Sequence, residues 1–223
     1  MSKQFMGIIA AIVIIFAAFF AFSGKNSNNS SGSKSSSKTA TQHTEGNGTT
    51  GVTLVEYGDY QCPYCEQYYS VVKQVQAEFN DQIHFQFRNF PLTNLHPNAF
   101  AAARAAEAAG LQNKFWEMHD LLYEPANWQV WTASSDPTKQ FNQYAQQLGL
   151  NVDQFKSDFA STKVNDLINA DMAAGNKLGV NGTPSFFLDG KHVEIGATAE
   201  AFAKVINAEI AKKAPQTNST TQQ

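Results

Sequence analysis

The sequence VEYGDYQCPYCEQY, residues 55–68, decides the fold because it contains both cysteines of the chain, spaced as C-P-Y-C at positions 62–65. The segment before them, VTLVEY at 52–57, is mostly β-branched and apolar and ends at Gly58, which is typical of a buried strand followed by a turn. After the cysteines, apolar residues recur every three or four positions as far as Phe79, which predicts an amphipathic helix. The cysteine pair is therefore expected at the junction of a strand and a helix.

Two thiols at this spacing on a first helical turn can close a small disulfide. The unpaired N–H groups and the positive end of the helix dipole favour a thiolate on Cys62, so the pattern indicates a redox site. Half of a zinc site is the alternative, but zinc needs further ligands. The sequence has no second C-x-x-C and no close pair of histidines. We therefore expect neither a metal site nor a cofactor.

The rest of the folded part reads as a strand, a helical block, and a closing hairpin with a helix. Turn signals, caps and apolar spacing give these elements. They are a strand at 83–87, helices at 98–109, 114–123, 136–148, 152–160 and 162–178, a hairpin at 185–195 around Asp189-Gly190, and a helix from Thr198 to about Lys212. The order β-α-β, helical block, β-β-α predicts an α/β fold, one sheet with helices on its faces and a helical insertion.

The N-terminal region does not look like a folded domain. Residues 5–22, FMGIIAAIVIIFAAFFAF, carry no charge and as a helix would span about 27 Å, which favours a transmembrane anchor over a cleaved signal peptide, the alternative. The polar stretch that follows has too few apolar side chains to form a core. The predicted organisation is a short segment at 1–4, the anchor at 5–22, a flexible polar linker at 23–51, a folded domain at 52–213 with a helical insertion at about 97–178, and a disordered tail at 214–223.

Charge and cysteine content bear on partners and location. A formal net charge of -3 leaves no excess of basic residues for nucleic acid, which we do not expect as a partner. A chain without a further cysteine avoids mispairing in an oxidising compartment. Lysines on both sides of the apolar run give only a weak bias in orientation. Together these features indicate a single-pass protein of the cell membrane with its catalytic domain on the extracytoplasmic side.

Three blocks of the sequence carry a family resemblance: residues 55–68, residues 87–124 (FRNFPLT to LLYE) and residues 180–197 (VNGTPSFFLDGKHVEIGA). In this order and spacing they resemble the DsbA-like proteins of thioredoxin fold, and most closely the membrane-anchored BdbD-like branch. The resemblance implies a thioredoxin fold with an inserted helical domain. It also implies oxidation or exchange of disulfides in thiol-containing secreted or surface proteins, and a membrane redox partner that resets the disulfide.

Roles follow from the resemblance residue by residue. It implies that Cys62 is the exposed nucleophile and Cys65 the buried resolving thiol. Thr183-Pro184 is similar to the family's cis-proline loop, which offers its backbone to the substrate. Glu56 is similar to the buried acid that takes a proton from the resolving thiol, although a partly exposed strand charge is the alternative. Three further residues match the family and are interpreted as structural: Asp59, Arg88 and His96.

The chain departs from the family between its cysteines. The DsbA pattern is C-P-H-C, whereas Pro63-Tyr64 here gives C-P-Y-C, which also resembles glutaredoxins. A helix N-terminus lowers a thiol pKa by about one unit, and neutral Tyr64 cannot add the charge of a histidine. We therefore predict an oxidase weaker than DsbA. The alternatives are a disulfide reductase or isomerase, and a tethered chaperone-like binding module without catalysis.

Overall fold

A computed structural model describes residues 39–214 of the 223-residue chain. The predicted anchor at 5–22, the first part of the predicted linker and nearly all of the predicted tail lie outside this range. Within residues 39–214 there is no helix with the length and apolar character needed to cross a bilayer.

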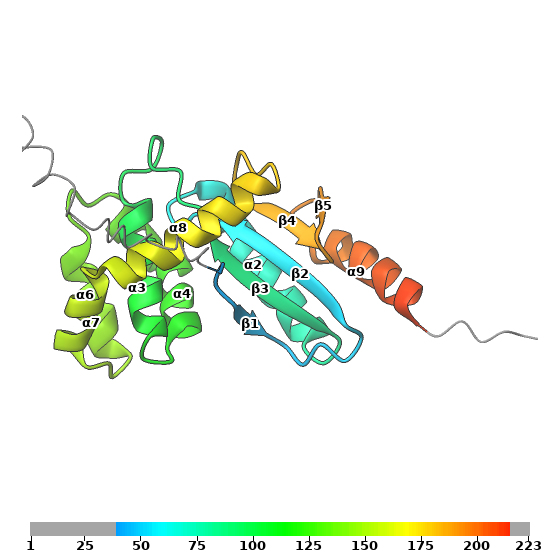
Figure 1. Cartoon of the computed structure of the whole chain (residues 1–223), viewed down its shortest axis with the longest axis horizontal. Coiled ribbons are helices and arrows are strands. Elements are labelled where there is room, and N and C mark those ends of the chain that lie inside the picture. Colours follow the sequence, from blue (N-terminus) through cyan, green and yellow to red (C-terminus); the bar gives the residue numbers. More distant parts are fainter. Residues whose placement is uncertain (1–38, 215–223) are drawn as a thin grey trace, which may run out of the picture. The chain divides into compact units, whose positions relative to one another are not determined.

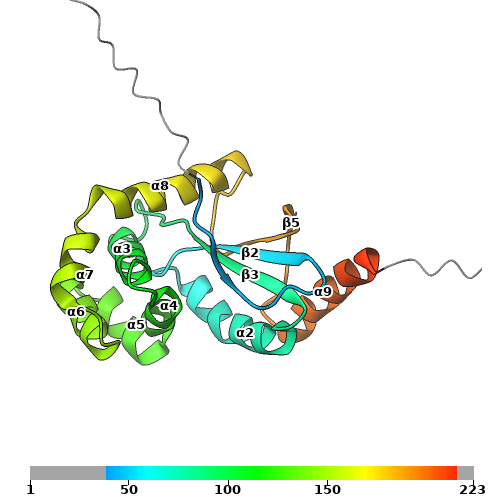
Figure 2. The ribbon, with the colours of Figure 1, turned by 60° about the horizontal axis from the view of Figure 1, so that its bottom comes forward.

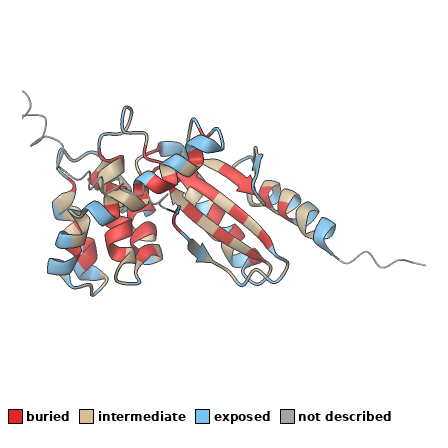
Figure 3. Ribbon diagram, in the orientation of Figure 1, coloured by how far each residue is buried: buried red, intermediate tan, exposed pale blue. Residues whose placement is uncertain are grey.

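The domain is built on one mixed sheet of five strands in the order β1-β3-β2-β4-β5 (Figure 1). The central pair, β2 and β3, is parallel, and the other neighbours are antiparallel. The strands are β1 (His43–Glu45), β2 (Val52–Gly58), β3 (Ile83–Asn89), β4 (Ser185–Leu188) and β5 (Lys191–Val193). Burial alternates along β3, as the banding in Figure 3 shows, because one face of this strand packs more tightly than the other.

Helices cover both faces of the sheet. Figure 2 shows α2 (Pro63–Phe79) and α9 (Ala199–Lys213) on one side and α8 (Thr162–Lys177) on the other. The side chain of Thr198 accepts a hydrogen bond from the main-chain N–H of Ala201, so the expected cap of the last helix is confirmed. The α/β fold with a helical insertion is confirmed as well.

The insertion between β3 and β4 contains one helix that the sequence did not predict. Its helices are α3 (Ala99–Gly110), α4 (Phe115–Tyr123), α5 (Pro125–Thr132), α6 (Thr138–Gln147), α7 (Val152–Phe159) and α8. The unpredicted one is α5, which buries a single residue, Trp131, and so lacks a periodic apolar face. Trp131 Nε1 donates a hydrogen bond to the main-chain oxygen of Leu122 at 2.9 Å, which fixes α5 against α4.

The prediction of a flexible linker up to residue 51 is wrong for residues 41–45, which belong to the fold. Thr41 is buried, and its N–H and hydroxyl donate to the two carboxylate oxygens of Asp171 in α8, at 2.7 and 2.8 Å. The ring of His43 stacks on Phe115 with centroids 3.5 Å apart, and its Nε2 lies 2.9 Å from Glu107. These partners are far away in the sequence, so polar composition alone gave no sign of them.

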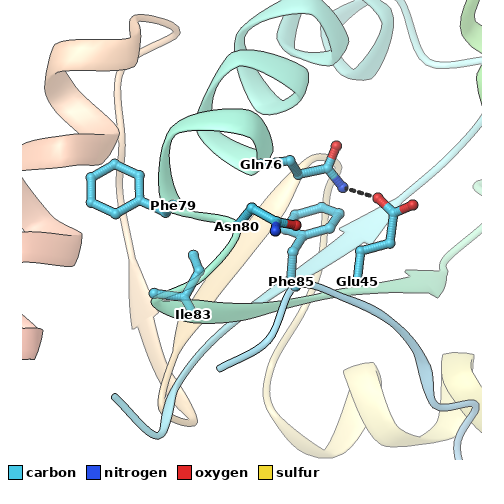
Figure 4. Close-up of a pocket in the computed structure, with 7 residues that line it drawn as sticks. Glu45, Gln76, Phe79, Asn80, Ile83 and Phe85 are labelled. Carbon is cyan, nitrogen blue, oxygen red and sulfur yellow. Dashed lines mark hydrogen bonds between the residues drawn. The ribbon is translucent and has the colours of Figure 1, made fainter. Parts of the chain in front are cut away.

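A small void lies where β1 meets the C-terminal end of α2. It measures about 30 Å³ and is lined by apolar and polar side chains that include Glu45 and Gln76. Figure 4 shows the hydrogen bond from Gln76 Nε2 to Glu45 Oε2, 3.0 Å long, at its edge. This volume suits about one water molecule, so the void is not a site for an organic ligand.

Candidate active site

The two cysteines sit at the start of α2, as the sequence predicted for their local structure. Cys62 is the N-cap residue, and its N–H donates to the main-chain oxygen of Asp59 at 3.0 Å. Pro63 occupies the first turn, where its missing N–H costs no hydrogen bond. Both thiols are free. The structure therefore holds the pair in its reduced form.

Cys62 is less accessible than the resemblance implied. Only 4% of its surface is exposed, against 1% for Cys65, so the expectation of an exposed nucleophile is wrong in degree. The main-chain oxygen of Thr183 lies against it and accepts a hydrogen bond from the Cys62 thiol at a distance of 3.3 Å. Cys62 remains the outer sulfur of the pair.

The environments of the two thiols drive their ionisation apart. A hydrogen bond from the Cys65 side chain, helped by the Thr183 side chain and by N–H groups at the start of α2, outweighs burial and lowers the pKa of Cys62 to about 6. Burial raises the pKa of Cys65 well above its usual value. At neutral pH the reduced pair thus carries a thiolate on Cys62 and a proton on Cys65.

Glu56 lies in the interior, on β2 beneath the cysteines. It is 4% exposed, and its partners in the neighbouring strands are Phe87 and Phe186. Burial in this apolar environment, together with the charge of Cys62, raises the pKa of Glu56 to about 8. The alternative of a partly exposed strand charge is therefore wrong. A carboxyl group with this pKa can both give and take a proton near neutral pH.

Thr183 and Pro184 are joined by a cis peptide bond, as the resemblance implied. A groove of about 270 Å³ begins at this loop and runs along β5. Tyr64, which is 67% exposed, forms part of its rim. The full lining is Tyr64, Tyr68, Thr183, Pro184, Phe186, His192, Val193, Glu194 and Ile195. A groove lined by both apolar and polar side chains beside a reactive sulfur can accommodate an extended peptide segment.

The three residues interpreted as structural have different surroundings. Arg88 lies over the ring of Tyr57, 6.0 Å from its centroid. The carboxylate of Asp59 is 1% exposed and pairs with His96 at 2.7 Å. Asp59 is close to Cys62 in sequence, which was the available signal of a role near the site. Within residues 39–214, no group of three or more His, Cys, Asp or Glu side chains is arranged to hold a metal ion.

Comparisons with known proteins agree with this geometry. A family model described as thioredoxin matches residues 38–208. The fold is similar to a thioredoxin-like oxidoreductase from Silicibacter pomeroyi DSS-3, with a TM-score of 0.61 and 30% identity over 77% of this chain and 92% of that one. It is also similar to BdbD from Bacillus subtilis, with a TM-score of 0.65 and 21% identity over 76% of this chain and 93% of that one.

A curated relative has a different kind of name. The chain is 36% identical over 148 residues to the protein named Na(+)/H(+) antiporter NhaA 1 from Mycolicibacterium gilvum. The match covers 66% of this chain but 23% of that relative. The chain thus spans less than a quarter of the length of this relative.

Proposed function

The chain belongs to the thioredoxin family and has the DsbA-like form of its fold, with an inserted helical domain. From this premise we propose that it is a protein thiol-disulfide oxidoreductase that oxidises thiols of other proteins. The observation that carries the proposal is the opposite shift of the two cysteine pKa values: that of Cys62 is lowered to about 6, while that of Cys65 is raised. A stabilised thiolate on the outer cysteine makes it a good leaving group and stabilises the reduced pair.

The reaction starts from the disulfide form. A substrate thiolate attacks Sγ of Cys62, so that a mixed disulfide forms, the Cys62–Cys65 bond breaks and Cys65 leaves as a thiolate. Cys65 then takes a proton, and the carboxyl group of Glu56, buried and protonated below about pH 8, is the donor. A second substrate thiolate attacks the substrate sulfur and releases the Cys62 thiolate. The substrate loses two electrons and the cysteine pair gains them.

The pKa of Cys62 also bears on the direction of electron flow. One pKa unit corresponds to about 1.4 kcal/mol, and about 30 mV of two-electron potential corresponds to the same energy. A value of about 6 lies below that of an ordinary thiol and above the value of about 3.5 for DsbA. The proposed enzyme is therefore an oxidant, but weaker than DsbA. A reductase or isomerase is the alternative within the same chemistry.

Location and partners complete the proposal. The domain is tethered to the cell membrane through residues 5–22 and faces the extracytoplasmic side, where its substrates are thiol-containing secreted or surface proteins. The uncharged apolar run and the lack of any cysteine besides Cys62 and Cys65 support this placement. A membrane redox partner accepts the two electrons and resets the disulfide.

The reduction potential of the Cys62–Cys65 pair tests the proposal. The protein is equilibrated with glutathione buffers, and free thiols are measured by alkylation. A potential near or above about -180 mV supports a disulfide donor, and a potential near about -270 mV supports a reductase instead. Cys62→Ala separates the disulfide donor and the reductase from a binding module. Retained cellular function in this variant would contradict an enzymatic role.

A further inference from the structure

The loop after β3, Leu92–Asn98, is fastened to the segment that leads into Cys62. Asp59 holds it: Oδ2 of this residue accepts hydrogen bonds from the N–H of Leu92 at 2.8 Å and from Nδ1 of His96 at 2.7 Å. Its other oxygen accepts from the N–H of Gln61 at 2.7 Å. Asp59 is 1% exposed, so this charge is kept in the interior by three donors.

A second hydrogen bond holds the C-terminal end of the same loop. The side-chain oxygen of Gln61 accepts a hydrogen bond from the N–H of Asn98 at 2.6 Å. The residue after Gln61 is Cys62 itself. The two ends of loop 92–98 are thus held by side chains that lie one and three positions before the reactive cysteine.

Loop 92–98 shares one end of the domain with the loop between α8 and β4. Beneath them lies a small apolar cluster in which Phe90 and Val180 pack with Tyr57 and Phe187, and Leu92 packs against it. In Figure 1 both loops lie at the upper edge, beyond the carboxyl ends of β2 and β3 and close to the start of α2. The two loops therefore border the end of the sheet at which Cys62 lies.

Exposed apolar side chains gather on this end. Four large apolar side chains are exposed among residues 39–214, and three of them, Tyr64, Leu95 and Leu178, belong to it, with 67%, 73% and 49% of their surfaces exposed. Leu95 is at the outer turn of loop 92–98, where its N–H donates to the main-chain oxygen of Leu92. Exposed apolar residues on the segments that border a reactive cysteine are candidates for contact with a partner.

The small exposed fraction of Cys62 limits how a partner can approach it. Because only 4% of the residue is accessible, a partner that forms a mixed disulfide has to lie directly over this end of the domain. The residues next to the partner's cysteine then come to rest on the surrounding loops. An extended segment of an unfolded chain can place its cysteine over Cys62 and its neighbouring residues on these loops.

We propose that Asp59 is a positioning residue that holds loop 92–98 as a second wall of the substrate site, and that Leu95 on this wall contacts an apolar side chain next to the reacting cysteine of an unfolded polypeptide. The first wall is formed by the Thr183-Pro184 loop, at which the groove begins. This inference rests on the proposed function and assigns one contact of its substrate site to loop 92–98.

The test compares a polypeptide with a small dithiol. The full-length protein oxidises reduced, unfolded ribonuclease A and, separately, dithiothreitol. Excess glutathione disulfide resets the Cys62–Cys65 pair after each turnover, and kcat and KM are measured for each substrate after subtraction of the uncatalysed rate. Leu95→Ser is expected to lower the ratio of kcat/KM for the polypeptide to that for dithiothreitol about fivefold, mainly through KM, because part of a leucine contact is lost. Val130→Ser, a change of the same kind on α5, keeps the wild-type ratio.

The positioning role has its own variants. Asp59→Asn is expected to lower the same ratio about as far as Leu95→Ser, and the double variant no further, since both remove the same wall. Gln61→Ala, which releases only the tie to Asn98, lowers it as well and serves if Asp59→Asn does not fold. An unchanged ratio in Leu95→Ser, or an equal fall in Val130→Ser, overturns the inference. Failure of the wild type to oxidise dithiothreitol would instead overturn the proposed function.

Discussion

The sulfur of Cys62 lies 3.3 Å from the main-chain oxygen of Thr183, to which the thiol donates its hydrogen bond. Loss of the proton removes this bond, because two acceptors then face each other. The hydroxyl of Thr183 is buried and has no hydrogen-bond partner in the reduced structure, yet it contributes to the lowered pKa of Cys62. One residue thus offers an acceptor to the thiol and a donor to the thiolate.

Removal of this hydroxyl is therefore expected to make Cys62 harder to ionise. In Thr183→Val the pKa of Cys62 should rise by roughly one unit, because a hydrogen bond to a charged group is worth at least about 1.5 kcal/mol. The thiolate absorbance, followed against pH, measures it. Ser185→Ala is the control, since the Ser185 hydroxyl donates to Gly182 in the same loop. Equal midpoints in wild type and Thr183→Val would contradict this account.

The residue between the cysteines should set the strength of the oxidant. Tyr64→His places an imidazole near Cys62, and its positive charge below about pH 6.5 stabilises the thiolate. The reduction potential should become more positive, more so at pH 6 than at pH 8. Because position 64 is 67% exposed, solvent screens the charge and the change is expected to stay below the roughly 30 mV that one pKa unit gives. Tyr64→Phe adds no charge and should leave the potential nearly unchanged.

The sequence predicted those parts of the fold whose signals are local. The cysteine pair follows a β-branched run and precedes a helical repeat, and the hairpin of β4 and β5 turns at Asp189-Gly190. Each of these patterns needs only neighbouring residues to be recognised. The resemblance supplied the cis bond before Pro184, which no local pattern specifies.

What remained hidden depends on contacts between distant residues. The burial of Glu56 depends on Phe87 and Phe186 in the strands on either side. The order of residues 41–45 depends on Asp171 and Glu107 in the insertion. A polar residue has the same local pattern whether or not its partner exists elsewhere, so propensity alone cannot place it.

Glu56 should make the reduced protein less stable as the pH rises. The pKa of Glu56 is about 8 in the folded state and 4.5 in the unfolded chain, so the unfolded chain releases this proton at a lower pH than the folded protein. The free energy of unfolding therefore falls between about pH 4.5 and 8, at up to about 1.4 kcal/mol per pH unit from this group. Glu56→Gln cannot titrate and lacks this loss. Urea unfolding at pH 5 and pH 8 should show that the free energy of unfolding falls less in the variant than in the wild type. An equal fall in both proteins would contradict the assignment.

Asp171 should be the residue that holds residues 41–45, the N-terminal arm, to the insertion. Its carboxylate accepts four hydrogen bonds, two from Thr41 and two from Asn89, and it is fully buried. Asp171→Asn turns an amide donor toward these donors and is expected to cost about 2 to 4 kcal/mol of unfolding free energy. Asp153→Asn, whose side chain is 98% exposed, should change stability by less than about 0.5 kcal/mol.

The contribution of the arm itself can be separated in a chain that begins at Val52 and so lacks Thr41. This chain should be less stable than one that begins at Thr39, because Asp171 loses two of its donors and Glu107 loses His43. In the shorter chain Asp171→Asn should cost clearly less, since only the two bonds from Asn89 remain to be broken. The same cost of Asp171→Asn in both chains would mean that Thr41 and Asp171 are not energetically coupled, and that the arm is ordered by β1 pairing alone.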